Sequence, residues 1–230
     1  MDQRPVAFFD IDGTVFRSSL LIELVQELVR EGVFPADVQQ GYAVAQAAWQ
    51  RREGMYEDYI EAVIATFLTH ITGVHYGVFA DVGRRVVATK SKQVYTYTRD
   101  YLRELKDRGY ILVAISQSPK TILDEFCRGY GFDKVYGRMY EIGPSDCFTG
   151  KVTDEQLISN KANIVERVFE RHPELTRVGS VAVGDTEGDI SLLSSVENPV
   201  CFNPNKALLD HARNQGWKVV VERKDVVYHL

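Results

Sequence analysis

Residues 8–14 read FFDIDGT, an apolar run that leads directly into two carboxylates separated by one residue. In an extended chain the side chains alternate, so Asp10 and Asp12 face one side while Ile11 faces the other. Gly13 lets the backbone turn closely around whatever the carboxylates hold. Neighbouring carboxylates repel each other unless a cation or a shared proton relieves them. A hard cation such as Mg²⁺, which prefers oxygen ligands, fits this pair.

Asp-x-Asp-Gly strings also occur in segments that carry out no catalysis. They are common in turns, and a similar string opens calcium-binding loops. A calcium loop needs an acid at its twelfth position, where Leu21 stands, and it follows a helix rather than a strand. The calcium loop is thereby excluded, but the stretch alone does not separate a turn from a functional pair of acids.

A second apolar run also ends at an acid. Residues 181–189 read VAVGDTEGD, with Asp185 directly after the run and Asp189 one helical turn later. The carboxyl ends of strands in an open α/β sheet form the ligand crevice, so Asp185 could join Asp10 on one metal, with Asp189 behind it. A helix whose first turn prefers acids also explains Glu187 and Asp189, but it explains Asp185 less well.

A helix start after a third apolar run could bind phosphate. Residues 115–119 read ISQSP, in which we expect Ser118 to cap a helix and Pro119 to be its first residue. A helix N-terminus presents free backbone N–H groups to an anion, and Ser116 adds a hydroxyl donor. A capping motif without any ligand accounts for these residues as well.

Lys161 stands at the start of a helical pattern that carries Ile164 and Val168. A lysine in the first turn is slightly unfavourable for the helix dipole, which gives a weak indication of a functional role. Most surface lysines are simply solvated.

The apolar runs predict the strands of a sheet, because each is as long as a buried strand. Three clear runs and two weaker ones cover residues 6–9, 111–115, 178–183, 200–202 and 218–221. Helical patterns lie between them, and a short hairpin is expected near 135–151. We therefore predict an α/β fold, a doubly wound parallel sheet of Rossmann type with helices on both faces.

Residues 16–89 interrupt this alternation. They contain no convincing strand and read as several helices. We predict an all-helical cap at 16–89, inserted after the first strand into a core formed by 1–15 and 90–230.

The composition is ordinary for a soluble globular protein, with 230 residues of which 45% are hydrophobic and 26% charged. The net charge of −5 offers nothing to a polyanion, so we expect no nucleic-acid partner. No stretch approaches the ~20 apolar residues of a membrane span, and the N-terminus lacks the pattern of a secretory signal. The distant cysteines Cys127, Cys147 and Cys201 form no CxxC pair. We therefore expect a cytoplasmic protein with reduced thiols and no membrane partner.

The motifs occur in a characteristic order along the chain. Residues 10–14 form the first, Ser116 the second, Lys161 the third, and Gly184 and Asp185 with Asp189 the fourth. In this order they resemble the haloacid dehalogenase-like superfamily, in the branch that includes the phosphoserine phosphatases. The helical insertion resembles the cap of that branch, and the resemblance covers essentially the whole chain.

The resemblance implies a phosphomonoester hydrolase that acts on a small phosphorylated metabolite. Asp10 would be the nucleophile that forms an aspartyl phosphate. Asp12 would protonate the leaving oxygen and then deprotonate the attacking water. Mg²⁺ would be held by the carboxylates of Asp10 and Asp185 and by the backbone carbonyl of Asp12, with Thr14 and Asp189 behind them. Dehalogenases of the superfamily lack the second acid, so Asp12 favours hydrolysis of phosphate esters.

The same resemblance implies that Ser116 and Lys161 bind the phosphate oxygens, with Gly13 and Gln117 offering backbone N–H groups. Gln117 stands where the branch usually has a small residue, and its side chain is large enough to reach the site. A phosphotransferase or mutase would use the same Asp10 chemistry with an acceptor other than water. A non-catalytic phosphate-binding protein is the third alternative.

The chain departs from the phosphoserine phosphatases in the residues that would hold the substrate. That family carries an acid shortly after the first motif, but residues 15–22 contain none and Glu23 comes late. It also uses a cap arginine, for which the candidates are Arg51, Arg52, Arg84 and Arg85.

The predicted cap is rich in aromatic residues, namely Tyr42, Trp49, Tyr56, Tyr59, Phe67, Tyr76 and Phe79. One interpretation is an aromatic pocket for an apolar or quaternary-ammonium leaving group. Aromatic residues at helical spacing more often pack in a core.

Overall fold

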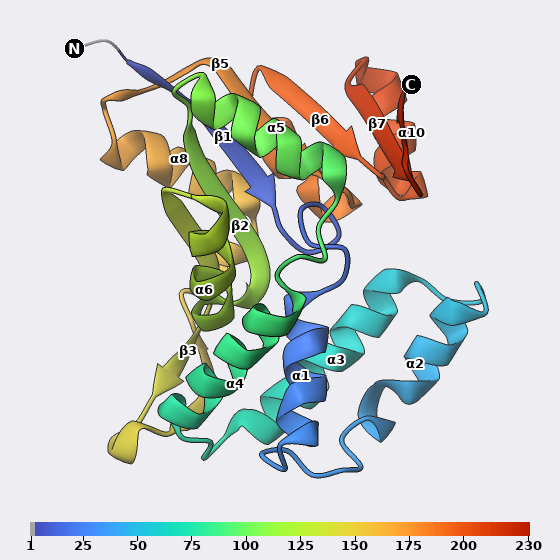
Figure 1. Ribbon diagram of the computed structural model, residues 1–230, viewed down its shortest axis with the longest axis vertical. Coiled ribbons are helices and arrows are strands. Elements are labelled where there is room, and N and C mark those ends of the chain that lie inside the picture. The colour runs from blue at the N-terminus through green and yellow to red at the C-terminus, as the bar shows by residue number, and fades with distance from the viewer. Residues whose placement is uncertain (1–2) are drawn as a thin grey trace.

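The computed structural model describes residues 3–230, and a single sheet lies at its centre (Figure 1). The strands are β1 (Arg4–Asp10), β2 (Ile111–Pro119), β3 (Lys134–Ile142), β4 (Phe148–Thr153), β5 (Leu175–Gly184), β6 (Asn198–Phe202), β7 (Lys218–Arg223) and β8 (Val226–His229). Their spatial order is β4-β3-β2-β1-β5-β6-β7-β8. Neighbours are parallel except at the two edges, where β4 and β8 run antiparallel to β3 and β7.

Except in the β3–β4 and β7–β8 hairpins, helices fill the connections between these strands. They are α1 (Leu20–Arg30), α2 (Gln40–Gln50), α3 (Tyr56–Ile71), α4 (Tyr76–Lys90), α5 (Thr96–Asp107), α6 (Lys120–Tyr130), α7 (Glu155–Ile158), α8 (Lys161–Arg171), α9 (Ile190–Leu193) and α10 (Lys206–Gln215). None of the helices within residues 3–230 is long and apolar enough to cross a membrane.

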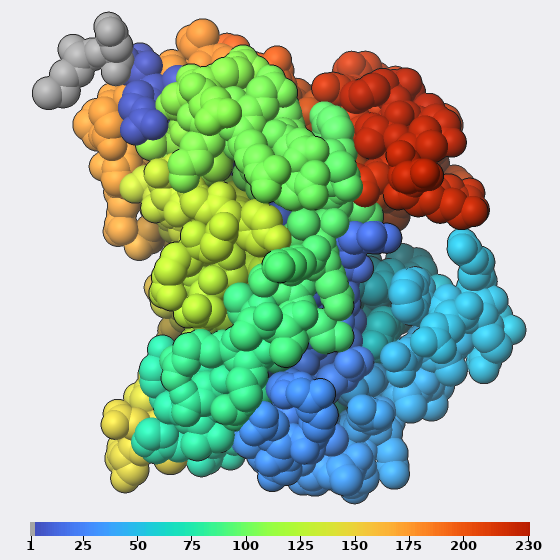
Figure 2. Space-filling model, viewed as in Figure 1, coloured from blue at the N-terminus to red at the C-terminus, as the bar shows by residue number. Residues whose placement is uncertain are grey.

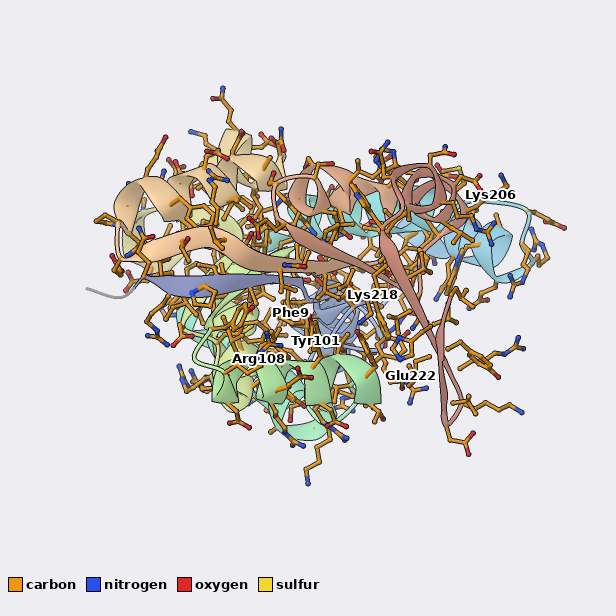
Figure 3. All side chains as sticks on the ribbon, turned by 90° about the horizontal axis from the view of Figure 1, so that it is seen from above. Phe9, Tyr101, Arg108, Lys206, Lys218 and Glu222 are labelled. Carbon is orange, nitrogen blue, oxygen red and sulfur yellow. The ribbon has the colours of Figure 1, made fainter. Side chains whose placement is uncertain are left out.

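Both faces of the sheet are covered, which explains why β1 is a continuous apolar run instead of an alternating one. Ala7 and Phe9 belong to an apolar cluster that includes residues of α5 and α6. Val6 and Phe8 belong to a second cluster with residues of α8, α9 and α10. Seen from above, the sheet lies between these two helical layers (Figure 3). The predicted doubly wound α/β fold is confirmed.

The strands follow the predicted runs, and two local details differ. Ser118 and Pro119 were expected to start a helix, but β2 continues through Pro119, which pairs with Arg138 of β3. Helix α6 therefore begins at Lys120, with Pro119 in the N-cap position. The edge strand β8 was not predicted, because it is a four-residue strand with mostly exposed side chains.

Helices α1 to α4 lie beyond the end of β1 at which Asp10 stands (Figure 1). The chain enters and leaves this helical segment at one place, where Phe16 and Val94 form an antiparallel bridge. Around this bridge, the backbone N–H of Tyr95 donates to the carbonyl of Val15 at 3.1 Å. The division into a cap at 16–89 and a core around it stays a prediction.

The apolar cluster on the α5 side of the sheet continues without a break into the helical segment. Phe67 of α3 packs against Tyr140 of β3, with ring centroids 5.3 Å apart. Phe79 of α4 packs against Phe148 of β4 at 5.0 Å. The β3–β4 hairpin therefore joins the sheet to the helices on one side. On the other side a hollow separates α2 from the C-terminal part of the chain (Figure 2).

Candidate active site

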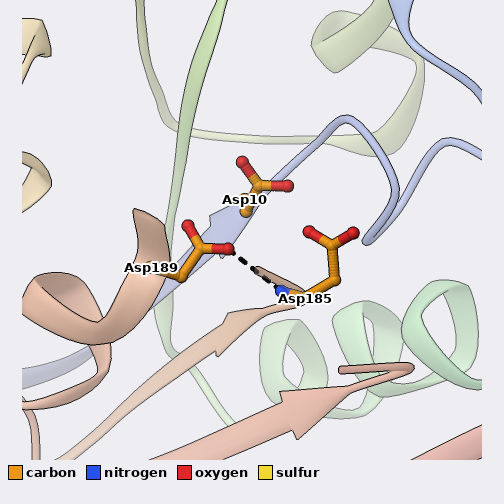
Figure 4. Close-up of side chains that lie close together, drawn as sticks. All are labelled: Asp10, Asp185 and Asp189. Atoms are coloured by element: carbon orange, nitrogen blue, oxygen red, sulfur yellow. Dashed lines mark hydrogen bonds between the residues drawn. The ribbon is translucent and has the colours of Figure 1, made fainter. Parts of the chain in front are cut away.

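The ends of two neighbouring strands bring three aspartates together. Asp10 is the last residue of β1, and Asp185 directly follows β5. These strands are parallel neighbours, so both acids lie at the same edge of the sheet. Asp189 ends a short 3-10 turn, η2 (Glu187–Asp189). One carboxylate oxygen of each acid lies within 4.8 Å of the other two (Figure 4).

Lys161 at the start of α8 reaches into this cluster. Its Nζ lies 2.6 Å from Oδ1 of Asp10 and 2.5 Å from Oδ1 of Asp189, and all three side chains are buried. Burial lowers the pKa of Lys161, but the charges of Asp10 and Asp189 outweigh burial and raise it above its usual value. The lysine is therefore a fixed cation, and one positive charge faces three carboxyl groups.

The cluster has the properties of a divalent-metal site. Oδ2 of Asp10 is buried and has no hydrogen-bond partner within residues 3–230. Burial, opposed by Lys161, raises the pKa of Asp10 to about 7, and burial together with the charge of Asp10 raises that of Asp185. A hard cation that prefers oxygen ligands would give the unpartnered oxygen of Asp10 a partner. It would also relieve the repulsion between Asp10 and Asp185. The residues present fit Mg²⁺.

Asp189 and Thr14 hold the other groups of the cluster in place. Oδ2 of Asp189 accepts the backbone N–H of Asp185 at 3.0 Å (Figure 4). It also accepts the backbone N–H of Thr186 at 3.2 Å. The hydroxyl of Thr14 donates to Oδ1 of Asp185 at 3.1 Å. Since both oxygens of Asp189 are engaged, Asp10 and Asp185 are the acids best placed to bind a metal.

Gly13 has a steric reason to be glycine. Its φ of +83° lies in the left-handed region, and a Cβ at this position would stand 2.2 Å from Oδ2 of Asp185. Any larger residue would displace a carboxylate of the candidate metal site.

Asp12 points to a different set of partners. Its carboxylate accepts the backbone N–H of Leu20 at 2.6 Å, the hydroxyl of Ser118 at 2.8 Å and the hydroxyl of Ser116. Burial raises its pKa, and these hydrogen bonds oppose the rise. Ser116, expected to bind phosphate, thus donates to the candidate acid. Ser118, expected to cap α6, donates to Asp12 and accepts the backbone N–H of Leu21 at 3.1 Å.

Gln117 does not send its side chain toward the acids. Its amide donates to the carbonyl of Ile158 at 2.9 Å and accepts from Nη2 of Arg138 at 2.8 Å. The side chain therefore connects the end of β2 to the last residue of α7, three residues before Lys161. The backbone N–H of Gln117, which was the group predicted to bind phosphate, is left as its one contribution to that role.

Above the acids lies a cavity of about 1390 Å³ between the helical segment and the sheet edge. Its lining includes Asp10, Asp12, Lys161 and Asp185 from the sheet side. From the helical segment it includes Leu21, Trp49, Gln50, Arg52, Gly54, Met55, Tyr56, Glu57, Ile60 and Ile64. The acid cluster is thus open to a space large enough for a small metabolite.

The arginines and aromatic residues of the predicted cap separate into those that line the cavity and those that lie elsewhere. Surface ion pairs are formed by Arg51, Arg84 and Arg85. Of the four arginines, Arg52 alone lines the cavity. Among the aromatic residues, Trp49 and Tyr56 line the cavity. Buried packing positions are occupied by Tyr42, Tyr59, Phe67 and Phe79.

Tyr56 is one of the seven aromatic candidates of the predicted cap, and the sequence did not distinguish it from those that only pack in the core. Burial raises its pKa above the usual value, and the charges of Asp12 and Asp185 add to the rise. Its phenol therefore stays protonated and can donate a hydrogen bond to a group bound in the cavity beside the acids. Its placement depends on how α3 packs over the sheet edge, and no local signal in the sequence carries that information.

Comparisons with known proteins identify the family of the chain. The model of the haloacid dehalogenase-like hydrolase family matches residues 7–194. The phosphoserine phosphatase SerB1 of Mycobacterium tuberculosis is 24% identical over 221 residues, which are 95% of this chain and 71% of that protein. A histidinol-phosphatase of Neisseria meningitidis is 24% identical over 225 residues, covering 94% of this chain and 97% of that protein.

Solved structures show the same fold. A phospho-aspartyl intermediate analogue of phosphoserine phosphatase superposes with a TM-score of 0.62 at 18% identity, covering 97% of this chain and 96% of that chain. The chain belongs to the haloacid dehalogenase-like hydrolase family. Within it, the chain is a phosphatase of the branch that includes the phosphoserine phosphatases.

Replacing Ser118 by alanine tests how Asp12 is held. The variant loses one of the hydrogen bonds to the Asp12 carboxylate, so we expect kcat for an alkyl phosphate to fall roughly tenfold. The loss should be smaller with p-nitrophenyl phosphate, whose leaving group needs less protonation. Ser194→Ala, at an exposed position on the surface, is the matched control. Equal losses with both substrates would show that Ser118 does not act through the acid.

Proposed function

We propose that the protein is a Mg²⁺-dependent phosphomonoester hydrolase that acts on a small phosphorylated metabolite through an aspartyl phosphate on Asp10. The observation that carries this proposal is the buried, unpartnered Oδ2 of Asp10, which belongs to an acid cluster lining the cavity. Because no protein group holds this oxygen, the Asp10 carboxylate keeps an oxygen for metal or phosphorus beside the one that Lys161 fixes.

The reaction has two displacements. In the first, an Asp10 oxygen bonds to phosphorus, the bond to the leaving oxygen breaks, and Asp12 gives that oxygen a proton. In the second, Asp12 takes a proton from water, the water oxygen bonds to phosphorus, and the bond to Asp10 breaks. The products are an alcohol and inorganic phosphate, and both acids return to their starting states.

The remaining residues bind and orient. Lys161 fixes the Asp10 carboxylate through its 2.6 Å contact and offers positive charge beside the phosphate position. Ser116, Ser118 and the N–H of Leu20 hold Asp12 in one orientation. Bound at Asp10, Asp185 and the Asp12 backbone carbonyl, Mg²⁺ would supply charge that screens the repulsion between the nucleophile and the phosphate.

A panel of phosphomonoesters with Mg²⁺ tests this function. The panel includes O-phosphoserine and histidinol phosphate, because two relatives are named as a phosphoserine phosphatase and a histidinol-phosphatase. We expect release of inorganic phosphate, its loss with a chelator, and its recovery on adding Mg²⁺. Release that falls when an alcohol acceptor is added, with a new phosphate ester formed, would identify a phosphotransferase. No turnover of any ester would contradict both.

Metal binding should also appear as pH-dependent stabilisation. Folding raises the pKa of Asp10 from 3.8 to about 7, and that of Asp185 rises as well. The metal-free folded protein therefore holds protons that the unfolded chain has lost, so its stability falls as pH rises from about 4 to about 7. Bound Mg²⁺ replaces those protons. We expect Mg²⁺ to raise Tm more at about pH 8 than at about pH 5.

Differential scanning fluorimetry measures this effect without any substrate. Asp185→Asn removes one metal ligand and should remove the Mg²⁺-dependent shift. Asp107→Asn makes the same chemical change at an exposed acid at the end of α5 and should keep the shift. A shift that persists in Asp185→Asn would place the ion elsewhere.

A further inference from the structure

Helix α3 has two apolar faces, of which one is buried in the core and the other also lines the cavity. Tyr59, Val63 and Phe67 are buried in the apolar cluster. Tyr56, Ile60 and Ile64, which follow one another at four-residue spacing, pack against the edge of this cluster and also line the cavity. These three side chains are only partly buried. An apolar stripe that faces a cavity above catalytic acids is available to a ligand.

Leu21 and the α3 stripe form one apolar wall of the cavity, which begins next to the candidate acid Asp12. The backbone N–H of Leu21 donates to the Ser118 hydroxyl, which in turn donates to the Asp12 carboxylate. The buried side chain of Leu21 also lines the cavity. Since Asp12 protonates the leaving oxygen in the proposed reaction, the carbon atoms bonded to that oxygen would meet Leu21 and the α3 stripe.

An aromatic group continues the wall outward. Trp49 stacks on Tyr59 with ring centroids 5.7 Å apart and packs against Tyr56 at 5.3 Å. Trp49 nevertheless keeps 40% of its surface exposed, and it lines the cavity together with Tyr56. A ring fixed by two aromatic neighbours and still exposed is a surface on which a planar group can stack.

The helical segment brings two charged side chains to the cavity. Arg52 and Glu57 line the cavity, but both are exposed. Glu23 of α1 pairs with Lys90 and is absent from the cavity lining in residues 3–230. On the sheet side of the cavity, Glu187 accepts from Asn205 and Lys206 pairs with Asp210. An ammonium and a carboxylate one carbon away from the ester, as in phosphoserine, would meet the apolar side chains of Leu21 and Ile64 on the opposite side. Burying unpaired charges in this way is costly.

We infer that the substrate's leaving group is an uncharged apolar alcohol that carries a planar ring, packed against Leu21, Ile64, Tyr56 and Trp49. The inference rests on the proposed phosphatase function and adds the substrate class. It also implies that the departure from the phosphoserine pattern after the first motif is a change of specificity.

A pair of alkyl phosphates tests the inference directly. Ethyl phosphate and 2-phenylethyl phosphate have similar leaving oxygens and differ by one ring. We expect kcat/KM for 2-phenylethyl phosphate to exceed that for ethyl phosphate by roughly tenfold or more. It should also exceed kcat/KM for O-phosphoserine and for choline phosphate, which present a zwitterion and a cation respectively.

Variants of Trp49 show whether the preference arises at this wall. Trp49→Ala should lower the ratio of the two kcat/KM values roughly tenfold, and Trp49→Phe should restore most of it. Tyr76→Ala removes another exposed aromatic residue of the helical segment that packs on Phe148, and it should leave the ratio unchanged.

The possible outcomes separate this inference from the proposed function. Turnover of all four esters without a preference for the ring would overturn the inference and keep the phosphatase. A preference for choline phosphate or phosphoserine would do the same and would assign the specificity to the charged residues. A preference that survives in Trp49→Ala would contradict the assigned wall. Absence of turnover on every ester would sink the function itself.

Discussion

Replacing Asp10 by asparagine is expected to abolish phosphate release while leaving the fold intact. The amide has nearly the same shape as the carboxylate. Its oxygen can still accept a hydrogen bond from the Lys161 ammonium, which lies 2.6 Å from Asp10 in the wild-type protein. It cannot form the covalent phosphoryl bond, because an amide oxygen is a poor nucleophile. The change also removes one of the mutually repelling carboxylates from a buried cluster. We therefore expect unchanged or higher stability and a loss of kcat on the order of 10⁴-fold or more.

Acid quenching under single-turnover conditions measures the intermediate itself. The wild-type protein should carry a phosphoryl group on the peptide that contains Asp10, detected by mass spectrometry, and Asp10→Asn should carry none. Circular dichroism and thermal unfolding establish that the variant is folded, and Asp107→Asn controls for the loss of an acid elsewhere. Substantial residual turnover in a folded Asp10→Asn protein would falsify the assignment of the nucleophile.

Replacing Lys161 by methionine is expected to affect stability and activity together. Methionine has a similar length without the charge, so Asp10 and Asp189 would remain buried with no cation between them. Removing one member of a buried ionic group typically costs about 3–5 kcal/mol. Asp10, whose pKa is already raised by burial, can escape part of this cost by taking up a proton, so the loss should be larger at about pH 8 than at about pH 5.

Urea denaturation at the two pH values measures the difference. Lys120→Met breaks the pair with Asp124 on the surface of α6 and should change the free energy of unfolding by less than about 1 kcal/mol. Added Mg²⁺ should recover part of the stability of Lys161→Met, because the ion supplies positive charge to the same acids. Equal stability of Lys161→Met and the wild-type protein would show that the buried pairs do not hold the cluster together.

Much of the fold could be predicted because the sheet is buried on both faces. Two-sided burial makes the central strands continuous apolar runs, and those runs are visible at residues 6–9 and 111–115. The exact end of β2 could not be predicted, because its pairing with Arg138 overrides the local tendency of Ser118 and Pro119 to start a helix. Tertiary pairing of this kind leaves no trace in the local sequence.

The acids at the strand ends could be predicted for the same reason, since the ends of parallel strands share one edge. Asp10 and Asp185 meet there because β1 and β5 are neighbours. The partners of Asp12 and the position of Tyr56 could not be predicted. They depend on how α1 and α3 lie over the sheet edge, which is set by packing between residues far apart in the chain.

The apolar cluster that runs from β1 into α1, α3 and α4 has a consequence for how the molecule melts. Phe9 on the sheet and Phe67 in the helices belong to one connected set of buried side chains. The helices therefore cannot unfold without exposing the face of the sheet that they help to cover. Heating should give one cooperative calorimetric transition, with equal calorimetric and van't Hoff enthalpies. The α2 side borders the hollow that opens on the acids, so substrate should enter there, whereas the α4 side is closed by its packing on β4.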